Sequence, residues 1–430
     1  MKLKKILAAV AMATLSVFGL VGCASSADAT VTVRLWDQNV ADAYKKSFAE
    51  LTKETGIKVV VKVIPWSDYW SQLRVDLASG TADDIFWTNA GNYEEYAKQG
   101  LLSAISKSDF ANQWSDWESS VVTQYTTDGK LWGVPQLSDP GIGLIYNKDL
   151  LDKYHVSIDT IKTLNWNSLR TVAQLLTRDT TDRPASDANF DAARVKQYGF
   201  NAAFDLNAIV LNFLGSNGAA WQEGDKFVFD SPKGLATFQY LADLINQYKV
   251  SPPASDTNPP TGGDLSRDLF LQGKLAMFET GAYNLANIQT GAKFHWGIAM
   301  IPSGPAGAVS VTNGIIAAAN ANTKDAAAQL TVLKWLGGKG AKYIGDSGSA
   351  LTAVKSARDS YFAYWNSQQV DISPMTDVLK NGYIQAPRGA NYGAAEAAYQ
   401  PILNDLFTGK LSVPTALTKA QAAANLAMEK

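Results

Sequence analysis

The chain lacks the residue sets of the common catalytic and phosphate-binding motifs. Its only two histidines, His155 and His295, give little material for a histidine-based triad or a zinc site. Each Gly-Lys pair is followed by Leu or Gly, never by Ser or Thr, which excludes a Walker-type phosphate loop. The segment 345–348 lacks the closing glycine of a nucleophile elbow. A pair of carboxylates for glycoside hydrolysis is not excluded, because the sequence does not give the distance between acidic side chains.

Aromatic residues at the expected ends of strands and helices are the stronger signal. The chain has 12 Trp and 17 Tyr, and those at such ends are Trp36, Trp87, Trp221, Tyr283 and Tyr392. A pyranose has apolar faces and a hydroxyl edge, so flat rings and surrounding polar groups suit it. A stacked ring that removes roughly 40 Å² of apolar surface from water contributes about 1 kcal/mol. Packing in the core is the alternative for each ring.

Polar side chains beside these aromatics are candidates for binding the hydroxyl edge of a sugar. They are Asp37, Gln38, Asn89, Asp139, Asn313 and Arg388. Each is equally suited to be a cap or turn residue, and Asn313-Gly314 is a typical turn pair. We expect no cofactor and no metal ligand. The acidic loop 179–191 could hold calcium, with a solvated loop as the favoured interpretation.

Composition favours an exported two-domain protein with an uncharged partner. A chain of 430 residues is longer than one hydrophobic core usually organises, which predicts two domains. Charged residues make up only 18% of the chain. The net charge of −2 and the lack of a basic cluster interleaved with aromatics argue against nucleic acid.

The N-terminus predicts export and a lipid anchor. Basic residues followed by a short apolar run make 1–22 a signal peptide rather than a membrane span. Leu20-Val21-Gly22-Cys23 is similar to a bacterial lipobox, and Cys23 is the only cysteine of the chain. We therefore expect lipidation at Cys23, a tether over 23–30 and anchorage to the outer face of the bacterial cytoplasmic membrane.

Predicted strands and helices alternate along the first part of the fold. Strands over 31–36, 57–64 and 84–87 are separated by helices that end at Gly56 and Gly80, with Ser67 as the expected cap of the second helix. This pattern predicts a parallel, doubly wound α/β sheet. Ligands of such sheets bind at the carboxyl ends of the strands, which puts Trp36 and Trp87 with their polar neighbours on one rim.

The stretch Gly129 to Leu150 predicts a crossover between two lobes, with an ordinary loop as the alternative. Its turn, Ser138 to Gly143, separates two apolar runs, and Gln136 and Asp139 are expected to face the space between the lobes. A second crossover is predicted at Pro302 to Pro305 and a third near Leu336. These give lobe 1 as 31–138 plus 305–336, and lobe 2 as 139–304 plus 337–430.

Several motifs resemble the extracellular solute-binding proteins of sugar ABC importers, in particular the maltose-binding type. The similar segments are Phe48-Ala49-Glu50 with Glu54-Thr55-Gly56-Ile57-Lys58-Val59, Asp84-Ile85-Phe86-Trp87, Tyr96-Ala97 with Gly100-Leu101-Leu102, Gly129-Lys130-Leu131, and Leu144-Ile145-Tyr146-Asn147-Lys148-Asp149-Leu150-Leu151. The resemblance implies a periplasmic-binding-protein-like fold, with two doubly wound α/β lobes, a hinge and a ligand cleft.

The same resemblance implies roles for individual residues. Tyr283 stands where the family often has a sugar-stacking aromatic, Trp87 and Tyr392 match two further aromatics, and Asp139 falls close to an acidic ligand residue. Val40-Ala41 stands where the maltose-binding pattern has an Asp-Lys pair, and Asn89 replaces an acidic residue. These departures point away from maltose itself.

The sequence thus predicts a monomeric, lipid-anchored binding protein that delivers a neutral mono- or oligosaccharide to a membrane permease. A secreted carbohydrate-active enzyme and a sugar-sensing surface lipoprotein are the alternatives. Incubation with oligosaccharides distinguishes an enzyme from a receptor, because only the enzyme makes product.

Overall fold

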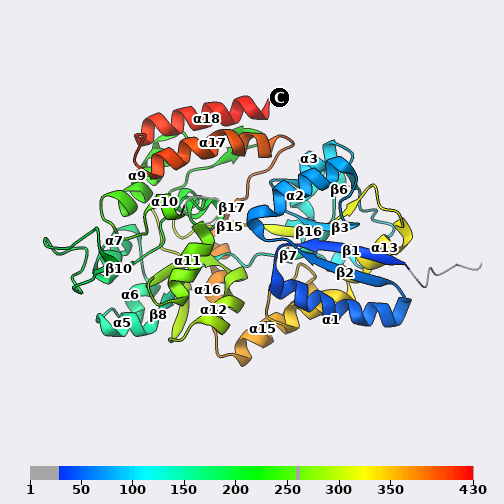
Figure 1. The fold of residues 1–430 in the computed structure, drawn as a ribbon, viewed down its shortest axis with the longest axis horizontal. Coiled ribbons are helices and arrows are strands. Elements are labelled where there is room, and N and C mark those ends of the chain that lie inside the picture. The colour runs from blue at the N-terminus through cyan, green and yellow to red at the C-terminus, as the bar shows by residue number, and fades with distance from the viewer. Residues whose placement is uncertain (1–28, 258–261, 430) are drawn as a thin grey trace, which may run out of the picture.

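The computed structural model describes residues 29–257 and 262–429, and in it the chain folds into two α/β lobes that lie side by side (Figure 1). This confirms the predicted class of two α/β lobes, although the main sheet of lobe 2 is antiparallel rather than doubly wound. The signal peptide, Cys23 and most of the tether lie outside the described residues. Within the described residues, no helix is both long and apolar enough to span a bilayer.

Lobe 1 is built on a mixed sheet in the order β2-β1-β3-β16-β4, with β7 also paired to β16. The strands are β1 (Thr30–Leu35), β2 (Lys58–Val63), β3 (Ile85–Thr88), β4 (Leu102–Ser103), β7 (Val134–Ser138) and β16 (Gly314–Asn320). β1 runs parallel to β2 and β3, as the alternating pattern predicts, whereas β16 runs antiparallel to its neighbours. The carboxyl ends of β1, β2 and β3 therefore share one edge.

Helices cover the sheet of lobe 1. They are α1 (Gln38–Thr55), α2 (Trp66–Ser79), α3 (Tyr93–Lys98), α4 (Ser119–Gln124), α13 (Ala326–Leu336) and α14 (Lys342–Asp346). The side chain of Asp37 caps α1 by accepting a bond from the Val40 backbone N–H at 3.0 Å, and Gly56 ends it in the left-handed conformation. α2 begins at Trp66 after Pro65 and has no side-chain cap, so the expected cap at Ser67 is wrong.

Lobe 2 contains a three-stranded antiparallel sheet in the order β13-β8-β14. Its strands are β8 (Ile142–Asn147), β13 (Met277–Gly281) and β14 (Trp296–Met300). Around it lie α5 (Lys148–Lys153), α6 (Ile158–Lys162), α7 (Trp166–Leu176), α8 (Leu211–Ser216), α9 (Pro232–Asn246), α10 (Ala254–Thr257), α11 (Gly262–Leu271), α12 (Leu285–Gly291), α16 (Ser373–Asp377), α17 (Tyr392–Phe407) and α18 (Val413–Met428).

Several short strands lie outside these two sheets. They are β5 (Thr126–Thr127), β6 (Lys130–Leu131), β9 (Arg178–Asp179), β10 (Val195–Gln197), β11 (Gln222–Glu223), β12 (Lys226–Phe227), β15 (Ser310–Thr312) and β17 (Tyr383–Gln385). The remaining helix α15 (Arg358–Ser367) contacts α14 of lobe 1, while its Tyr361 and Trp365 belong to the core of lobe 2.

Two crossovers between the lobes lie next to each other. One is the turn between β7 and β8, and the other is Asn313, which precedes β16; the Asp139 N–H donates to the Asn313 carbonyl at 3.0 Å. The predicted second crossover at Pro302 to Pro305 comes too early, because β15 is still held in lobe 2. Its Ser310 Oγ accepts a bond from the Ile142 N–H at 2.8 Å, and β15 pairs with β17.

The third crossover falls later than predicted. The segment after Leu336 continues to pack on α1, since Ser47 accepts a bond from Trp335 and donates one to the Gly340 carbonyl. Thr352 and Val354 also bridge to Leu137 and Trp117 of lobe 1. We therefore propose that lobe 1 comprises 30–138 and 313–357, and that the chain returns to lobe 2 through α15.

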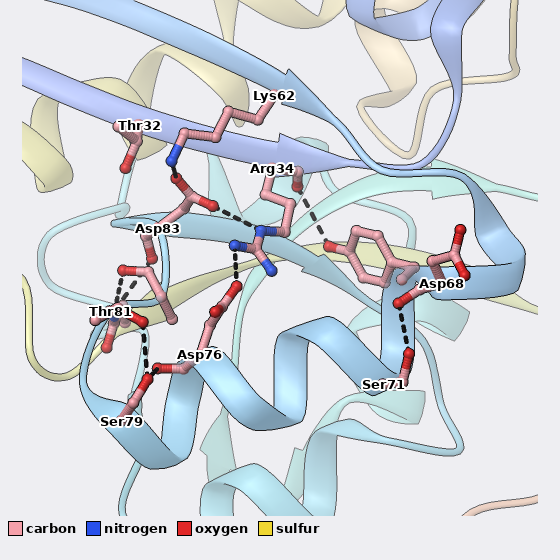
Figure 2. A network of polar contacts seen from close by, with 12 residues as sticks. Thr32, Arg34, Lys62, Asp68, Ser71, Asp76, Ser79, Thr81 and Asp83 are labelled. Carbon is pink, nitrogen blue, oxygen red and sulfur yellow. Dashed lines mark hydrogen bonds and ion pairs between the residues drawn. The ribbon is translucent and has the colours of Figure 1, made fainter.

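A buried ion-pair network fixes the strand ends of lobe 1 (Figure 2). The Arg34 guanidinium of β1 contacts Asp83, which precedes β3, at 2.6 Å and Asp76 of α2 at 2.5 Å. Lys62 of β2 reaches the other Asp83 oxygen at 2.6 Å. Burial opposes the charge of Arg34, but these carboxylates outweigh it and raise its pKa. The network joins β1, β2, α2 and the start of β3 directly behind the rim.

Replacing Asp83 with Asn is expected to lower the free energy of unfolding by about 3 kcal/mol, because it leaves the buried Arg34 charge partly uncompensated. Urea denaturation measures the loss. The control Asp42→Asn removes an exposed pair with Lys45 and should cost less than about 0.5 kcal/mol. Equal effects of the two substitutions would contradict the assigned role of the network.

Candidate functional site

Four tryptophans meet where the strands of lobe 1 end. Trp36 follows β1, and its ring centroid lies 5.1 Å from that of Trp87, 5.2 Å from that of Trp66 and 5.4 Å from that of Trp70. Trp36 and Trp70 are partly buried, and Trp66 is 43% exposed. Trp66 is not among the residues predicted for the site, although it begins the helix that follows the second predicted strand and thus shares the rim.

Trp87 supports this cluster from below. Its side chain is fully buried, and its indole N–H donates to the Tyr44 hydroxyl at 3.1 Å. The Tyr44 hydroxyl in turn donates to Gln136 Oε1. Gln136 is therefore buried inside lobe 1 and does not face the space between the lobes, which corrects the expectation for that residue.

On lobe 2, Tyr283 lies beside the crossover. It follows β13, whose last residue Gly281 pairs with Ile142 at the start of β8, and its side chain is 38% exposed. Partial burial raises the pKa of Tyr283, and the negative charges of Asp205 and Asp139 raise it further. The charges of Asp139 and Asp205 thus both act on Tyr283. Asp205, which caps the turn before α8 by accepting the Ala208 N–H at 2.9 Å, was not singled out from the sequence.

Three carboxyl groups of this region have raised pKa values because they are withdrawn from water. Burial raises the pKa of Asp139 to about 7. It also raises the pKa of Asp37 and of Asp205, although each accepts backbone hydrogen bonds that act in the opposite direction. Within the described part of the chain none of the three forms an ion pair. Their unused oxygens can accept hydrogen bonds from hydroxyl groups.

The lobes touch on both flanks of this region. On one flank the Asn39 side chain of α1 donates to the Asn287 side chain of α12 at 3.3 Å. On the other flank Arg388 approaches Glu94 of α3 at 3.9 Å and donates to the Gln124 carbonyl at 3.4 Å. The predicted site residue Arg388 therefore takes part in a contact between the lobes.

Three further predicted site residues make local bonds typical of caps and turns. Gln38 is exposed and donates to Asp42, and the side chain of Asn89 accepts a bond from Asn92 at 2.7 Å. Asn313 stands at the crossover, where its side chain accepts bonds from the Gly314 N–H and from Gln124. A ligand role for these residues stays a prediction.

Trp221 and Tyr392 lie in the core of lobe 2. Trp221 is 1% exposed and stacks on Phe229 with the ring centroids 4.4 Å apart. Tyr392 is 5% exposed, and its hydroxyl meets that of Tyr399 at 2.8 Å. Both rings are covered by protein, so the expectation that they offer open stacking faces is not met in this arrangement.

The acidic loop 179–191 is held together by Asp179. Burial disfavours the charged form of Asp179, but bonds from the backbones of Thr181, Arg183 and Asp191 outweigh it and lower its pKa. In the residues that the structure describes, no three acidic, His or Cys side chains gather as metal ligands do. The calcium hypothesis gains no support from this loop.

One cavity of about 420 Å³ lies beside the loop 179–191 and away from the predicted site residues. It is in lobe 2 and is lined by Tyr198, Lys249 and Ser251 among others. None of the predicted site residues borders it, so it offers no link to the aromatic rim.

The comparison with protein families decides the classification. The pattern of the bacterial extracellular solute-binding protein family matches residues 37–343, well over half of the chain. The chain belongs to this family. Among solved structures, UspC of M. tuberculosis is 46% identical, with a TM-score of 0.72 over 93% of this chain and 100% of that chain.

Further members of the solute-binding family are more distant. A galactooligosaccharide-binding protein of Bacillus subtilis (strain 168) is 29% identical over 116 residues, and an arabinooligosaccharide-binding protein of the same organism is 22% identical over 239 residues. These matches span 27% and 53% of this chain, and 27% and 49% of those two relatives. The GacH receptor of Streptomyces glaucescens, solved with acarbose, is 19% identical with a TM-score of 0.78 over 94% of this chain and 99% of that chain, which supports the fold.

The raised pKa of Asp139 predicts a pH-dependent gain from its removal. A carboxyl whose pKa is higher in the folded than in the unfolded protein stabilises the fold only at low pH, and this contribution is lost as the pH rises through about 7. Asp139→Asn should therefore raise the free energy of unfolding by ~1–3 kcal/mol at pH 8, after allowance for partial exposure, and have little effect near pH 4.

Urea denaturation of both proteins between pH 4 and pH 8 measures this difference, with the exposed Asp109→Asn as the control. A gain that is constant across the pH range, or a loss at pH 8, would show that Asp139 is not held in a desolvated site.

Proposed function

We propose that this solute-binding protein captures a neutral sugar or oligosaccharide between its lobes and delivers it to the permease of an ABC importer. The main supporting observation is that both lobes carry partly exposed aromatic rings at the ends of their strands, Trp36 with Trp66 on lobe 1 and Tyr283 on lobe 2, while the carboxyl group of Asp139 stands without an ion-pair partner at the crossover. The relatives that bind galacto- and arabinooligosaccharides support a sugar as the ligand.

Each part of the proposed site has a physical task. The rings of Trp36 and Trp66 on lobe 1 and of Tyr283 on lobe 2 offer apolar faces to the C–H faces of a pyranose. Asp37, Asp139 and Asp205 accept hydrogen bonds from hydroxyl groups around its edge. Trp87 holds Trp36 in place without touching the ligand itself.

Ligand contacts with both lobes favour the arrangement in which the lobes touch. A sugar that binds lobe 1 through Trp36 and lobe 2 through Tyr283 shifts the population toward this arrangement by the difference in its affinity for the two states. The closed surface then distinguishes loaded from empty protein for the permease. Within the proposal, Cys23 carries the lipid that keeps the protein at the outer face of the cytoplasmic membrane, and the protein acts as a monomer.

A thermal-shift screen against mono- and oligosaccharides tests the proposal directly. A ligand present at 100 times its Kd stabilises the folded state by about 2.7 kcal/mol, which is readily measured. Analysis of the same mixtures for hydrolysis products tests the alternative that the protein is an enzyme. Stabilisation without product supports a receptor, whereas hydrolysis of the sugar, or no response to any carbohydrate, contradicts it.

Replacing Tyr283 with Ala should weaken the affinity for the identified sugar at least tenfold, because one of the stacking faces is removed. The melting temperature of the unliganded protein should change by no more than a few degrees, since the ring is partly exposed. Isothermal titration calorimetry measures the affinity. Tyr383→Ala, at a more exposed tyrosine on β17, is the matched control and should bind normally. Unchanged affinity of Tyr283→Ala places the sugar elsewhere.

A further inference from the structure

One flank of the interlobe region is a close contact between two segments far apart in sequence. We call it the seam: Gly91, Glu94 and Glu95 of lobe 1 against the segment Arg388–Gly393 of lobe 2. In Figure 1 the end of α17 at which the helix begins points toward α3. A cavity of about 350 Å³, lined by Glu95, Lys98, Asn391 and neighbours, marks where the two lobes meet there.

Gly91 lies directly under the ring of Tyr392. A Cβ atom at position 91 would stand 2.8 Å from both Cδ1 and Cε1 of that ring, closer than real Cβ contacts. The nearest other atom is Asn89 Oδ1 at 3.8 Å, an ordinary contact within lobe 1. Gly91 is not in the left-handed conformation, so alanine would fit its backbone. A side chain at this position therefore conflicts only with the opposite lobe.

Tyr392 cannot easily move aside to make room. Its hydroxyl is bonded to that of Tyr399 at 2.8 Å, and its ring stacks on Phe227 with the centroids 6.3 Å apart. The preceding Asn391 is tied to the Met428 carbonyl of α18 at 3.0 Å. The ring is thus a rigid part of lobe 2 that seats on bare backbone of lobe 1.

The polar contacts of the seam orient the two segments but add little strength. Gln222 exchanges two bonds with the Arg388 backbone, at 2.7 Å and 3.0 Å, and so fixes this loop on lobe 2. The Arg388–Glu94 pair is long at 3.9 Å, and the arginine side chain is 44% exposed, so water screens the pair. Steric fit at Gly91 is the more demanding condition for the contact.

We propose that Gly91 is a positioning residue for closure, whose missing side chain lets the Tyr392 ring seat and so sets how fully the lobes close. Adding a methyl group here disfavours the closed arrangement without disturbing either lobe. Because ligand affinity scales with the population of the binding-competent state, the same change weakens sugar binding. This last consequence rests on the proposed function, whereas the effect on closure does not.

A cross-linking experiment measures closure without any sugar. In a full-length chain carrying Cys23→Ser, the substitutions Asn39→Cys and Asn287→Cys place thiols on the opposite flank, where the native side chains are 3.3 Å apart. A short bis-maleimide joins them when the lobes close; a disulfide would demand Cβ atoms only ~4 Å apart. Adding Gly91→Ala should slow cross-linking at least fivefold, with an unchanged melting temperature.

Gly393→Ala is the matched control, because it adds the same methyl group at the same seam. Its Cβ would meet only the ends of two flexible side chains of lobe 1, Glu95 at 3.3 Å and Arg74 at 3.7 Å, so cross-linking should proceed at the unmodified rate. Tyr392→Leu, which removes the opposing ring atoms, should restore cross-linking to the Gly91→Ala protein. Equal rates in the Gly91→Ala and unmodified proteins, or equal slowing by both glycine substitutions, would overturn the proposal.

Titration with the identified sugar completes the test. Gly91→Ala should weaken its affinity at least fivefold, and Gly393→Ala should leave the affinity as it is. If the unmodified protein binds no carbohydrate while Gly91→Ala still slows cross-linking, the proposed function fails and the closure role of Gly91 stands. Normal affinity together with normal cross-linking contradicts the closure role alone.

Discussion

The backbone hydrogen bond from Asp139 to Asn313 holds together the two neighbouring crossovers on which the rest of the structure depends. β7 and β16 pair in lobe 1, with Ser138 opposite Gly314. Beyond this pair, the segment that follows β7 enters β8, and the segment that precedes β16 comes from β15. The pairing forces both connections through the same place. A rotation of one lobe against the other therefore needs few backbone changes, and these are concentrated beside the candidate ligand residues.

The two flanking contacts between the lobes differ in chemistry. The Asn39–Asn287 contact is a single hydrogen bond between side chains, which water can replace when the lobes part. The seam instead joins a rigid aromatic ring to bare backbone at Gly91. Polar contacts break readily when the lobes separate, whereas the steric fit at Gly91 determines which closed arrangement is reached.

The sequence predicted the elements whose partners are close in the chain. The alternation from Val31 to Trp87 predicted the parallel pairing of β1 with β2 and β3, and with it the rim that carries Trp36. Contacts between residues far apart in the chain could not be predicted in this way. Trp221 is an example: it packs against Tyr399, which lies on a helix much later in the sequence, and no local pattern shows that this ring buries it. The same reason explains Tyr392, which matched a family aromatic but seats at the seam. The second crossover was misplaced because Pro302 to Pro305 resembles a boundary, whereas β15 is kept in lobe 2 by two hydrogen bonds: the Ile142 N–H donates to Ser310, and the Val311 N–H donates to the Asn212 side chain.

The central claim is that one ligand is held by both lobes at once, beside the paired crossovers. Hydrogen–deuterium exchange with and without a sugar identified by screening tests it most directly. The account predicts that exchange slows together in three segments: 36–39 of lobe 1, 281–287 of lobe 2 and 138–143 at the crossover. Slowing confined to one lobe, or centred on the cavity beside Tyr198 and Lys249, would contradict it.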